Sequence, residues 1–380
     1  MAAPPLKGIR VIELARILAG PWAGQLLADL GADVIKVESP DGDDTRKWGP
    51  PFVMSHDGEN LSAAYYHCCN RGKRSIAIDF SRPEGAQTLR ELVATADVLI
   101  ENFKLGGLKK YGLDYESLKA INPRLVYCSI TGFGQDGPYA PRAGYDFIIQ
   151  AMAGMMSITG EPGGEPQKAG VAISDLFTGL YSVIAIQAAL RHAEKTGEGQ
   201  HIDMALYDCQ ISALGNQNLN YLVSGKSPAR MGNAHMNIAP YEVLPVRDGH
   251  IILAVGNDGQ FGKFCAVVGL TDLPADPDFA TNPARVANRA KLRERIIETL
   301  AAWDRDPLLA KLEAAGVPAS PINTIGQMFA DPQTIARGMR LDLDDGHGNL
   351  LPSVRAPMVM SGTPLVYERP SPRLGEHTQE

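Results

Sequence analysis

The amino-acid sequence predicts an α/β protein in which a mostly parallel sheet, covered by helices, is joined to a smaller α+β domain. Strand-like and helix-like segments alternate from residue 9 to residue 131, and a hairpin pattern replaces that alternation after residue 240. The chain has 380 residues. A single hydrophobic core stops growing at about 250–300 residues, so two domains or one elaborated domain are expected.

The first elements form a βαβ unit. An apolar strand over 9–14 is followed by a turn at Ala19-Gly20-Pro21, a helix over 22–30 and a second strand over 32–38. Strands alternating with helices imply a parallel sheet covered on both faces. Such sheets bind ligands beyond the carboxyl ends of their strands. The alternation continues with strands over 75–79, 97–101 and 125–131 and helices over 83–95 and 113–121, so the segments of interest are 15–21, 102–107 and 132–138.

The second half of the chain changes in style. A long apolar helix over 176–195 and a strand over 200–206 precede a polar, glycine-containing stretch at 216–238, which we interpret as a linker. A turn at Asp248-Gly249 between apolar segments then predicts a hairpin. Helices are expected near 260–268, 289–303 and 307–315, and a second turn-linked pair near 341–354. We therefore predict a large domain over 1–215, completed by 326–380, and a linker with a small α+β domain over 216–325.

Composition and charge narrow the class of protein. The net charge of −7, without any basic run, argues against nucleic acid as a partner, whereas a small anionic ligand needs only a few local cations. The 5 cysteines form no C-x-x-C pair, which favours a reduced, cytoplasmic protein. The N-terminus does not resemble a leader peptide, and no apolar run approaches the ~18 residues of a membrane span, so no membrane partner is expected.

Common cofactor motifs are absent from the sequence. It contains no G-x-x-x-x-G-K-[ST], no H-E-x-x-H and no G-x-S-x-G, and no G-x-G-x-x-G follows the first strand. The 8 histidines show no paired spacing typical of metal ligands. We therefore expect neither a bound metal nor a permanent cofactor.

Asp175 is the first candidate for a catalytic residue. It opens the helix predicted over 176–195, where an aspartate can cap free backbone N–H groups and the helix dipole favours its ionised form. Capping alone explains this position. A nucleophile or general base would also be placed here, where an extended segment leads into the start of a helix. The sequence position does not separate the two roles.

Other segments carry side chains suited to ligand binding. Asn102 and Phe103 follow a predicted strand and could offer an amide and a stacking ring, or serve as a cap and a core residue. Lys73-Arg74 and Lys109-Lys110 are cation pairs of a kind that is usually solvated but also suits phosphate contacts. The glycine-rich stretch at 132–139 is either a plain connection or a ligand-binding loop.

A set of short motifs recurs in a fixed order over nearly the whole chain. They are Leu18-Ala-Gly-Pro21, Leu30-Gly-Ala-Asp-Val-Ile-Lys-Val-Glu38, Asn70-Arg-Gly-Lys-Arg-Ser75, Ala96-Asp-Val-Leu-Ile-Glu-Asn-Phe103, Thr131-Gly-Phe-Gly-Gln-Asp-Gly-Pro138, Gly144-Tyr-Asp146, Asp175, Thr196-Gly-Glu-Gly-Gln200 and Leu374-Gly-Glu-His-Thr378. In this order they resemble the class III CoA-transferase family. That family includes formyl-CoA and carnitine CoA-transferases and is related to the 2-methylacyl-CoA racemases.

The resemblance implies a fold and a reaction. The fold is a Rossmann-like large domain built from both chain ends plus a small domain, assembled as an interlocked homodimer. The reaction moves CoA from an acyl-CoA donor to a carboxylic acid. Asp175 matches the aspartate that attacks the thioester, giving a mixed anhydride and then an aspartyl-CoA thioester. Segments 232–236 and 256–260 resemble relatives that use dicarboxylic acids, so succinyl-CoA is the expected donor; CoA and acyl-CoA are substrates here.

The resemblance also assigns CoA contacts by position. Tyr145 separates a transferase from a racemase, because the racemases carry a histidine there and an ordinary tyrosine, with a pKa of about 10, is a poor base at neutral pH. The implied CoA contacts are Leu18, Ala19, Asn70, Lys73, Arg74, Asn102, Phe103 and Lys110, with Arg142 and Tyr145 lining the approach.

Two other functions stay open as alternatives. One is a 2-methylacyl-CoA racemase or epimerase that uses Asp175 and a second base, and the other is a non-catalytic CoA-binding protein. Arg230 and His235 are further candidates, either for pairing with the distal carboxylate of an acceptor acid or as exposed linker residues.

Overall fold

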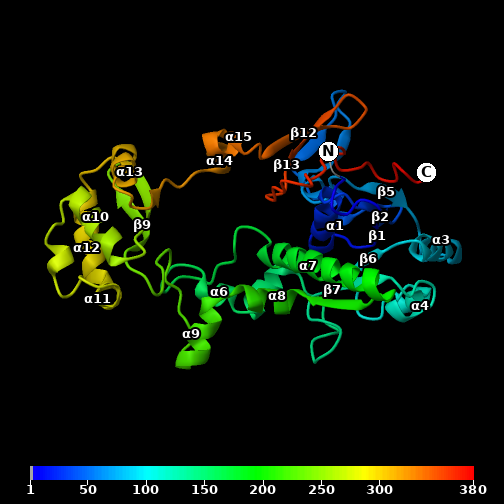
Figure 1. Cartoon of the computed structure of the whole chain (residues 1–380), viewed down its shortest axis with the longest axis horizontal. Helices are drawn as coiled ribbons and strands as arrows, with labels where there is room; N and C mark the ends of the chain where they lie inside the picture. Colours follow the sequence, from blue (N-terminus) through cyan, green and yellow to red (C-terminus); the bar gives the residue numbers. More distant parts are fainter. Residues whose placement is uncertain (1–2) are drawn as a thin grey trace. The chain divides into compact units, whose positions relative to one another are not determined.

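The computed structural model describes residues 3–380, which divide into two compact units (Figure 1). The first unit combines the residues up to 155 with 168–226 and 332–380, and the second combines 156–167 with 227–331. The two units divide after residues 226 and 331, and helix α9 (Asn216–Ser224), within the stretch that we interpreted as a linker, belongs to the first unit.

The first unit is built on a six-stranded sheet in the order β5-β2-β1-β6-β7-β8. All neighbouring strands are parallel, which confirms the predicted α/β class. In chain order this arrangement is 3-2-1-4-5-6, the order of a doubly wound Rossmann sheet. The strands are β1 (Arg10–Glu13), β2 (Asp33–Glu38), β5 (Arg74–Ala77), β6 (Val98–Glu101), β7 (Val126–Thr131) and β8 (His201–Ala205).

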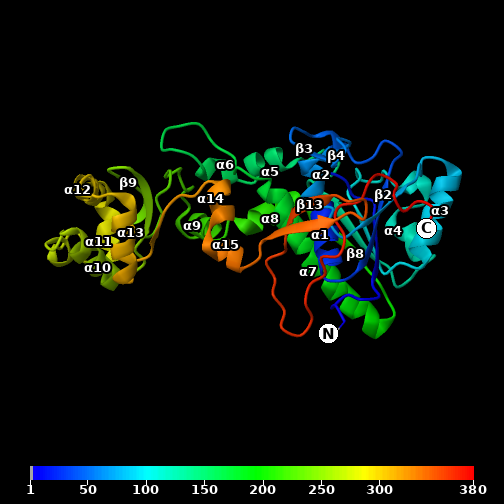
Figure 2. The ribbon, with the colours of Figure 1, turned by 90° about the horizontal axis from the view of Figure 1, so that it is seen from above.

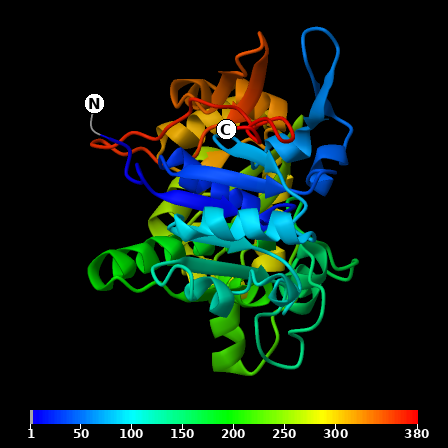
Figure 3. The ribbon, with the colours of Figure 1, turned by 90° about the vertical axis from the view of Figure 1, so that its right-hand side faces the viewer.

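Successive strand residues point to opposite faces of the sheet and feed two hydrophobic cores. Val11 and Val98 face a core shared with α1 and α7, whereas Ile12 and Leu99 face a core shared with α3 and α4. Figure 3 shows this layering, with the cyan α3 toward the viewer. The helices are α1 (Ala19–Asp29), α3 (Pro83–Ala94), α4 (Tyr115–Lys119) and α7 (Ile173–Thr196).

Helix α7 is long and apolar. Its 24 residues reach a mean hydropathy of 1.5 over an 18-residue window, so by length and composition it could cross a membrane. Polar residues interrupt its apolar stretches, so the sequence shows no continuous apolar run there. In the structure α7 packs against β7, α1, α5 (Asp146–Met152) and α8 (Leu206–Ala213). Figure 2 shows α1 and α7 side by side. The helix therefore forms part of the first unit's core, with Ile184 left exposed.

Smaller elements complete the first unit. The C-terminal tail runs along β5, where the His377 N–H donates to the Ser75 carbonyl at 2.9 Å. The remaining elements are β3 (Phe52–Met54), β4 (Asn60–Ala63), α2 (Ala64–His67), α15 (Pro332–Ala336), β12 (Arg340–Asp344), β13 (Leu350–Val354) and the 3-10 turns η1 (Asp44–Lys47) and η2 (Lys109–Tyr111); α6 (Met155–Ile158) spans the boundary between the units.

The second unit is a small α+β fold around an antiparallel sheet in the order β11-β10-β9. The hairpin predicted at Asp248-Gly249 forms between β9 and β10, and the residue pair nearest the turn is Val246 with Gly249. Phe261, Phe264 and Leu308 are buried in its own hydrophobic core. Its elements are β9 (Tyr241–Val246), β10 (Gly249–Ala254), β11 (Ala319–Ser320), α10 (Asp258–Val268), η3 (Leu273–Ala275), α11 (Asn282–Ala287), α12 (Arg289–Leu300), α13 (Arg305–Ala314) and α14 (Ile325–Ala330).

Candidate active site

A cavity of about 630 Å³ lies in the first unit, beyond the carboxyl ends of β1, β6 and β7. The strand order reverses between β1 and β6, which is where doubly wound sheets bind their ligands. The turns after β1 and β6 line the cavity with residues 16–19 and 102–105, and the end of β7 contributes Thr131 and the following Gly132. Segments chosen from the sequence therefore meet at one site, and its volume suits a small-molecule ligand.

Most of the predicted site residues line this cavity. They reach it from the turns after β1 and β6, from η2, from the loop before α5 and from the first turn of α7. The predicted residues in the cavity wall are Leu18, Ala19, Asn102, Phe103, Lys110, Arg142, Tyr145 and Asp175.

Asn70, Lys73 and Arg74, which the resemblance assigned to CoA, are not among the residues that line this cavity. The Lys73 ammonium is buried in an ion pair with Glu13 at 2.8 Å, and Asn70 accepts a hydrogen bond from it. Arg74 pairs with Asp33 at 2.6 Å. All three precede β5 or begin it, whereas the cavity is lined by residues that follow β5. These are Ile78, Asp79, Phe80 and Ser81.

Several lining residues were not predicted. Residues 78–81 follow β5, the strand that pairs with β2. They could have been predicted from the rule that ligands bind beyond the carboxyl ends of parallel strands. Arg16 and Lys104 bring cations from the two turns that the rule did identify. Arg16 pairs with Asp44 at 2.9 Å, so part of its charge is already neutralised.

Asp175 lies in the first turn of α7, at the cavity wall. Its carboxylate does not cap the helix. The N-cap residue is Ala172, and the Ser174 N–H donates instead to Asp146 Oδ1 at 2.8 Å. Asp146 is itself held by Gln150, whose amide donates to Oδ2 at 2.7 Å. Of the two roles that the sequence left open, the geometry therefore favours a carboxylate available to a ligand.

Burial and the neighbouring Asp146 carboxylate raise the pKa of Asp175 to about 7. We expected the helix N-terminus to favour the ionised form, but removal from water has the larger effect. At neutral pH the group therefore exists in both forms. A desolvated carboxylate that ionises near the working pH suits a nucleophile or a general base.

Asn102 connects the two turns that frame the cavity. Its side-chain oxygen accepts the Arg16 N–H at 2.9 Å, and its amide donates to the Arg16 carbonyl at 2.7 Å. The Phe103 N–H donates to Glu101 at 2.7 Å, and the Phe103 ring packs edge-on against Phe80 with the ring centres 5.6 Å apart. Asn102 therefore braces the site in addition to lining it.

The loop before α5 carries an exposed cation and an exposed phenol. The Arg142 guanidinium lies 4.0 Å from the centre of the Tyr139 ring and forms no ion pair within residues 3–380. Tyr145 precedes α5 with 63% of its surface exposed. Arg142 is thus free to bind an anion, and the position occupied by histidine in the racemases holds a solvated phenol. Arg230 and His235 belong to the second unit, where Arg230 donates to the Gly164 carbonyl.

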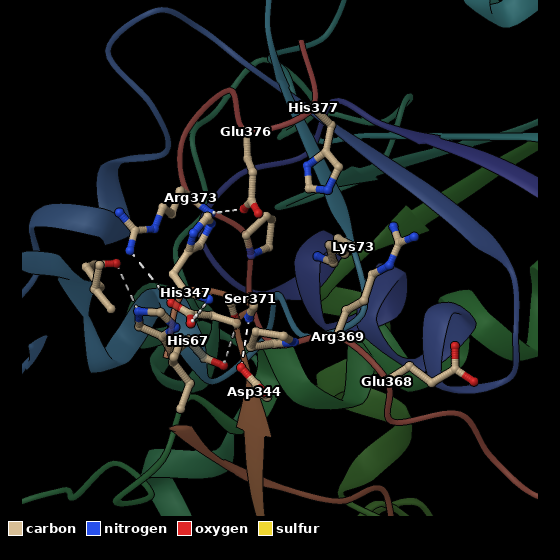
Figure 4. Close-up of a pocket in the computed structure, with 16 residues that line it drawn as sticks. His67, Lys73, Asp344, His347, Glu368, Arg369, Ser371, Arg373, Glu376 and His377 are labelled. Carbon is tan, nitrogen blue, oxygen red and sulfur yellow. Dashed lines mark hydrogen bonds and ion pairs between the residues drawn. The ribbon is translucent and has the colours of Figure 1, made fainter. Parts of the chain in front are cut away.

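A second cavity of about 320 Å³ lies between the β12–β13 turn and the C-terminal tail (Figure 4). Its carboxyl groups come from Asp344, Asp345, Glu368 and Glu376. These four carboxyl groups outnumber the three cationic side chains Lys73, Arg369 and Arg373, and the Lys73 ammonium is already paired. Because CoA is strongly anionic, the first cavity is the better candidate for its binding site. Within residues 3–380 no cluster of His, Cys, Asp or Glu is arranged to hold a metal.

Comparison with known proteins identifies the family. The family model described as "CoA-transferase family III" matches residues 6–378. The chain is 65% identical to a succinate–glutarate CoA-transferase of Agrobacterium fabrum, over 98% of this chain and 94% of the relative. It is 42% identical to the human succinyl-CoA:glutarate CoA-transferase, over 98% of this chain and 84% of the relative.

A solved structure is also similar. A CaiB/BaiF family protein from Brucella suis superimposes with a TM-score of 0.89 at 63% identity, covering 99% of this chain and 98% of that one. The fold, the motif order and the family match agree over nearly the full length. The chain belongs to CoA-transferase family III.

Proposed function

We propose that this CoA-transferase moves CoA from succinyl-CoA to a second dicarboxylic acid, with Asp175 as the covalent carrier. Family membership supports the transferase activity, and the names of the similar bacterial and human enzymes support the choice of substrates. The observation that carries the proposal is the Asp175 carboxylate, which lies at the wall of the cavity without capping its helix. Arg142, an exposed cation that lines the cavity, is our candidate for binding the distal carboxylate of the acid.

The reaction proceeds by exchange at carbonyl carbons. The ionised Asp175 attacks the succinyl thioester, the C–S bond breaks, and the CoA thiolate leaves a mixed anhydride. The thiolate then attacks the aspartyl carbonyl, which releases succinate and forms an aspartyl-CoA thioester. The acceptor carboxylate attacks this thioester, giving a second anhydride and free thiolate. Attack of the thiolate on the acceptor's acyl carbon yields the new acyl-CoA and regenerates Asp175.

The N-terminus of α1 supplies donors for the negative charges in this sequence. Leu18 is its N-cap residue, no side chain caps the helix, and Leu18 and Ala19 line the cavity. Free N–H groups at a helix N-terminus bind anions and can stabilise a developing oxyanion. The geometry suits either a phosphate of CoA or the oxygen of the attacked carbonyl.

Mass spectrometry of the full chain tests the carrier role. After mixing with succinyl-CoA and rapid acid quenching, we expect a CoA adduct on the peptide that contains Asp175. Asp175→Asn should lose both the adduct and the transfer to glutarate while still binding CoA. Full activity of Asp175→Asn would refute the mechanism. Exchange of the α-hydrogen with heavy water, without transfer to any acid, would support the racemase alternative.

We also propose that the protein forms the interlocked homodimer that the resemblance implies. The free thiols support our proposal of a cytoplasmic location. Helix α9 buries none of its residues, and Leu222 and Val223 are 72% and 84% exposed. Large exposed apolar patches are typical of protein interfaces. Size-exclusion chromatography with light scattering should give a dimer for the wild type and a smaller species for Val223→Asp. A monomeric wild type would contradict the assembly.

A further inference from the structure

The turn between β1 and α1 rests on a buried cluster of charged side chains. Glu13, Lys36, Asp43 and Lys73 are each at most 1% exposed. The Lys36 ammonium lies 3.1 Å from Glu13 and 3.0 Å from Asp43, and the Lys73 ammonium lies 2.8 Å from Glu13. The cluster joins two cations to two anions, so no buried charge is left without a partner.

Both lysines also bind the backbone of the turn. Lys36 donates to the Ala15 carbonyl at 3.0 Å, and Lys73 donates to the Pro21 carbonyl at 2.8 Å. The third acceptor of Lys73 is Asn70 Oδ1 at 2.8 Å. An ammonium group has three N–H donors. Because each lysine has an acceptor for every donor, neither has an N–H group left for a phosphate of CoA.

The turn needs this support because its backbone is strained. Ile17 has a φ of 72°, in the left-handed region that a β-branched residue rarely adopts. Its N–H faces the Asp43 carboxylate, at 3.3 Å and 3.4 Å from the two oxygens. The cluster thus holds the chain at positions 15, 17 and 21. Leu18 and Ala19, which line the cavity, lie between these fixed points.

We propose that Lys73, together with Lys36, is a positioning residue that sets the turn presenting Leu18 and Ala19 to the substrate. In this proposal Lys73 is not a ligand of the CoA phosphates. The proposal rests on the proposed binding of CoA in the first cavity. Gly24 supports it, because a Cβ there would lie 1.8 Å from Glu13 Oε2, so α1 requires glycine where it packs on the cluster.

A truncated substrate separates positioning from phosphate binding. Succinyl-pantetheine keeps the thioester but lacks the nucleotide and its phosphates. The double variant Glu13→Gln/Lys73→Met replaces one ion pair by neutral side chains of similar size and leaves Lys36 paired with Asp43, a change that buried ion pairs often tolerate. We expect kcat to fall between about tenfold and about a hundredfold with both substrates, because the turn shifts.

The matched control is Lys119→Met, which removes an exposed lysine of α4 that does not line the cavity. It should leave both reactions unchanged. A loss confined to succinyl-CoA would make Lys73 a phosphate ligand, and an unchanged kcat with both substrates would make the cluster purely structural. Either result overturns the proposal.

Hydrogen exchange of the wild type gives a second test that does not depend on how the variant folds. A turn held by the cluster is already formed in the free enzyme, so the N–H groups of Arg16, Ile17 and Trp22, which are bonded within the protein, should be protected without CoA. The uncapped N–H groups at Leu18 and Ala19 gain protection when CoA binds them directly. Protection of Arg16, Ile17 and Trp22 that develops only with CoA would overturn the proposal. Failure of the wild type to transfer CoA to any acid would instead refute the proposed function.

Discussion

The ionisation of Asp175 should set the pH dependence of CoA transfer. Its carboxyl has a pKa of about 7 in the fold, raised by burial and by Asp146, and only the ionised form attacks a thioester. The ionised fraction is then about 9% at pH 6 and about 91% at pH 8, so kcat/KM should rise about tenfold over that interval. The direction is a gain of activity with rising pH.

The assay is the initial rate of transfer from succinyl-CoA to glutarate between about pH 5.5 and about pH 8.5. The terminal phosphate of CoA also titrates within this range, near pH 6, and would contribute to the pH profile. Succinyl-pantetheine, which has no phosphate, serves as the control for that titration. Asp146→Asn keeps an oxygen that can accept the Ser174 N–H and removes the charge that raises the pKa of Asp175. The midpoint should therefore move to lower pH. A rate independent of pH, or a midpoint that moves upward, would refute this reasoning.

Three further predictions concern stability and binding. Asp175→Asn should raise the melting temperature at pH 8, because the fold disfavours the ionised carboxylate. The gain in melting temperature should shrink as the pH falls from about 7 toward about 4, where the wild-type carboxyl becomes protonated. Scanning calorimetry would measure this gain, and an equal gain at every pH would count against the raised pKa of Asp175. Gly132→Ala places a Cβ 2.5 Å from the Gly144 Cα, so KM for acyl-CoA should rise, whereas Gly262→Ala, which meets nothing within 4 Å, should be neutral in the same assay. Glu101→Ala leaves the Phe103 N–H, in a turn that lines the cavity, without its acceptor, and steady-state kinetics should show KM for acyl-CoA increased by about tenfold, with an unchanged KM as the contrary result.

The large fold could be predicted because local pattern and tertiary structure agree there. The apolar strand at 9–14 and the helix after Pro21 appear as β1 and α1, and the parallel sheet follows from their alternation with later elements. Helix α9 was missed because its sequence is polar and its apolar residues are exposed, so it carries no signal of burial. The hairpin of β9 and β10 was found because an Asp-Gly turn specifies it locally.

The candidate site was predictable only in part. The turns after β1 and β6 follow from topology, because carboxyl ends of parallel strands share one edge of the sheet. Asp175 was identified in a different way, by its place at the start of a predicted helix and by the resemblance. The direction of the Lys73 side chain does not follow from its neighbours in sequence, since its partner Glu13 lies 60 residues away. Nor does any local pattern predict a positive φ at Ile17, because the strain is supported by residues distant in the chain.

The most direct test of the central claim is the transfer of heavy oxygen from an acceptor acid to Asp175. If the acceptor carboxylate attacks an aspartyl-CoA thioester, one of its oxygens remains on the aspartate after the second anhydride is resolved. Turnover with glutarate labelled in both carboxylates should therefore place heavy oxygen in the peptide that contains Asp175, as read by mass spectrometry after proteolysis. An unlabelled Asp175 after many turnovers, with labelled glutaryl-CoA formed, would contradict the covalent mechanism.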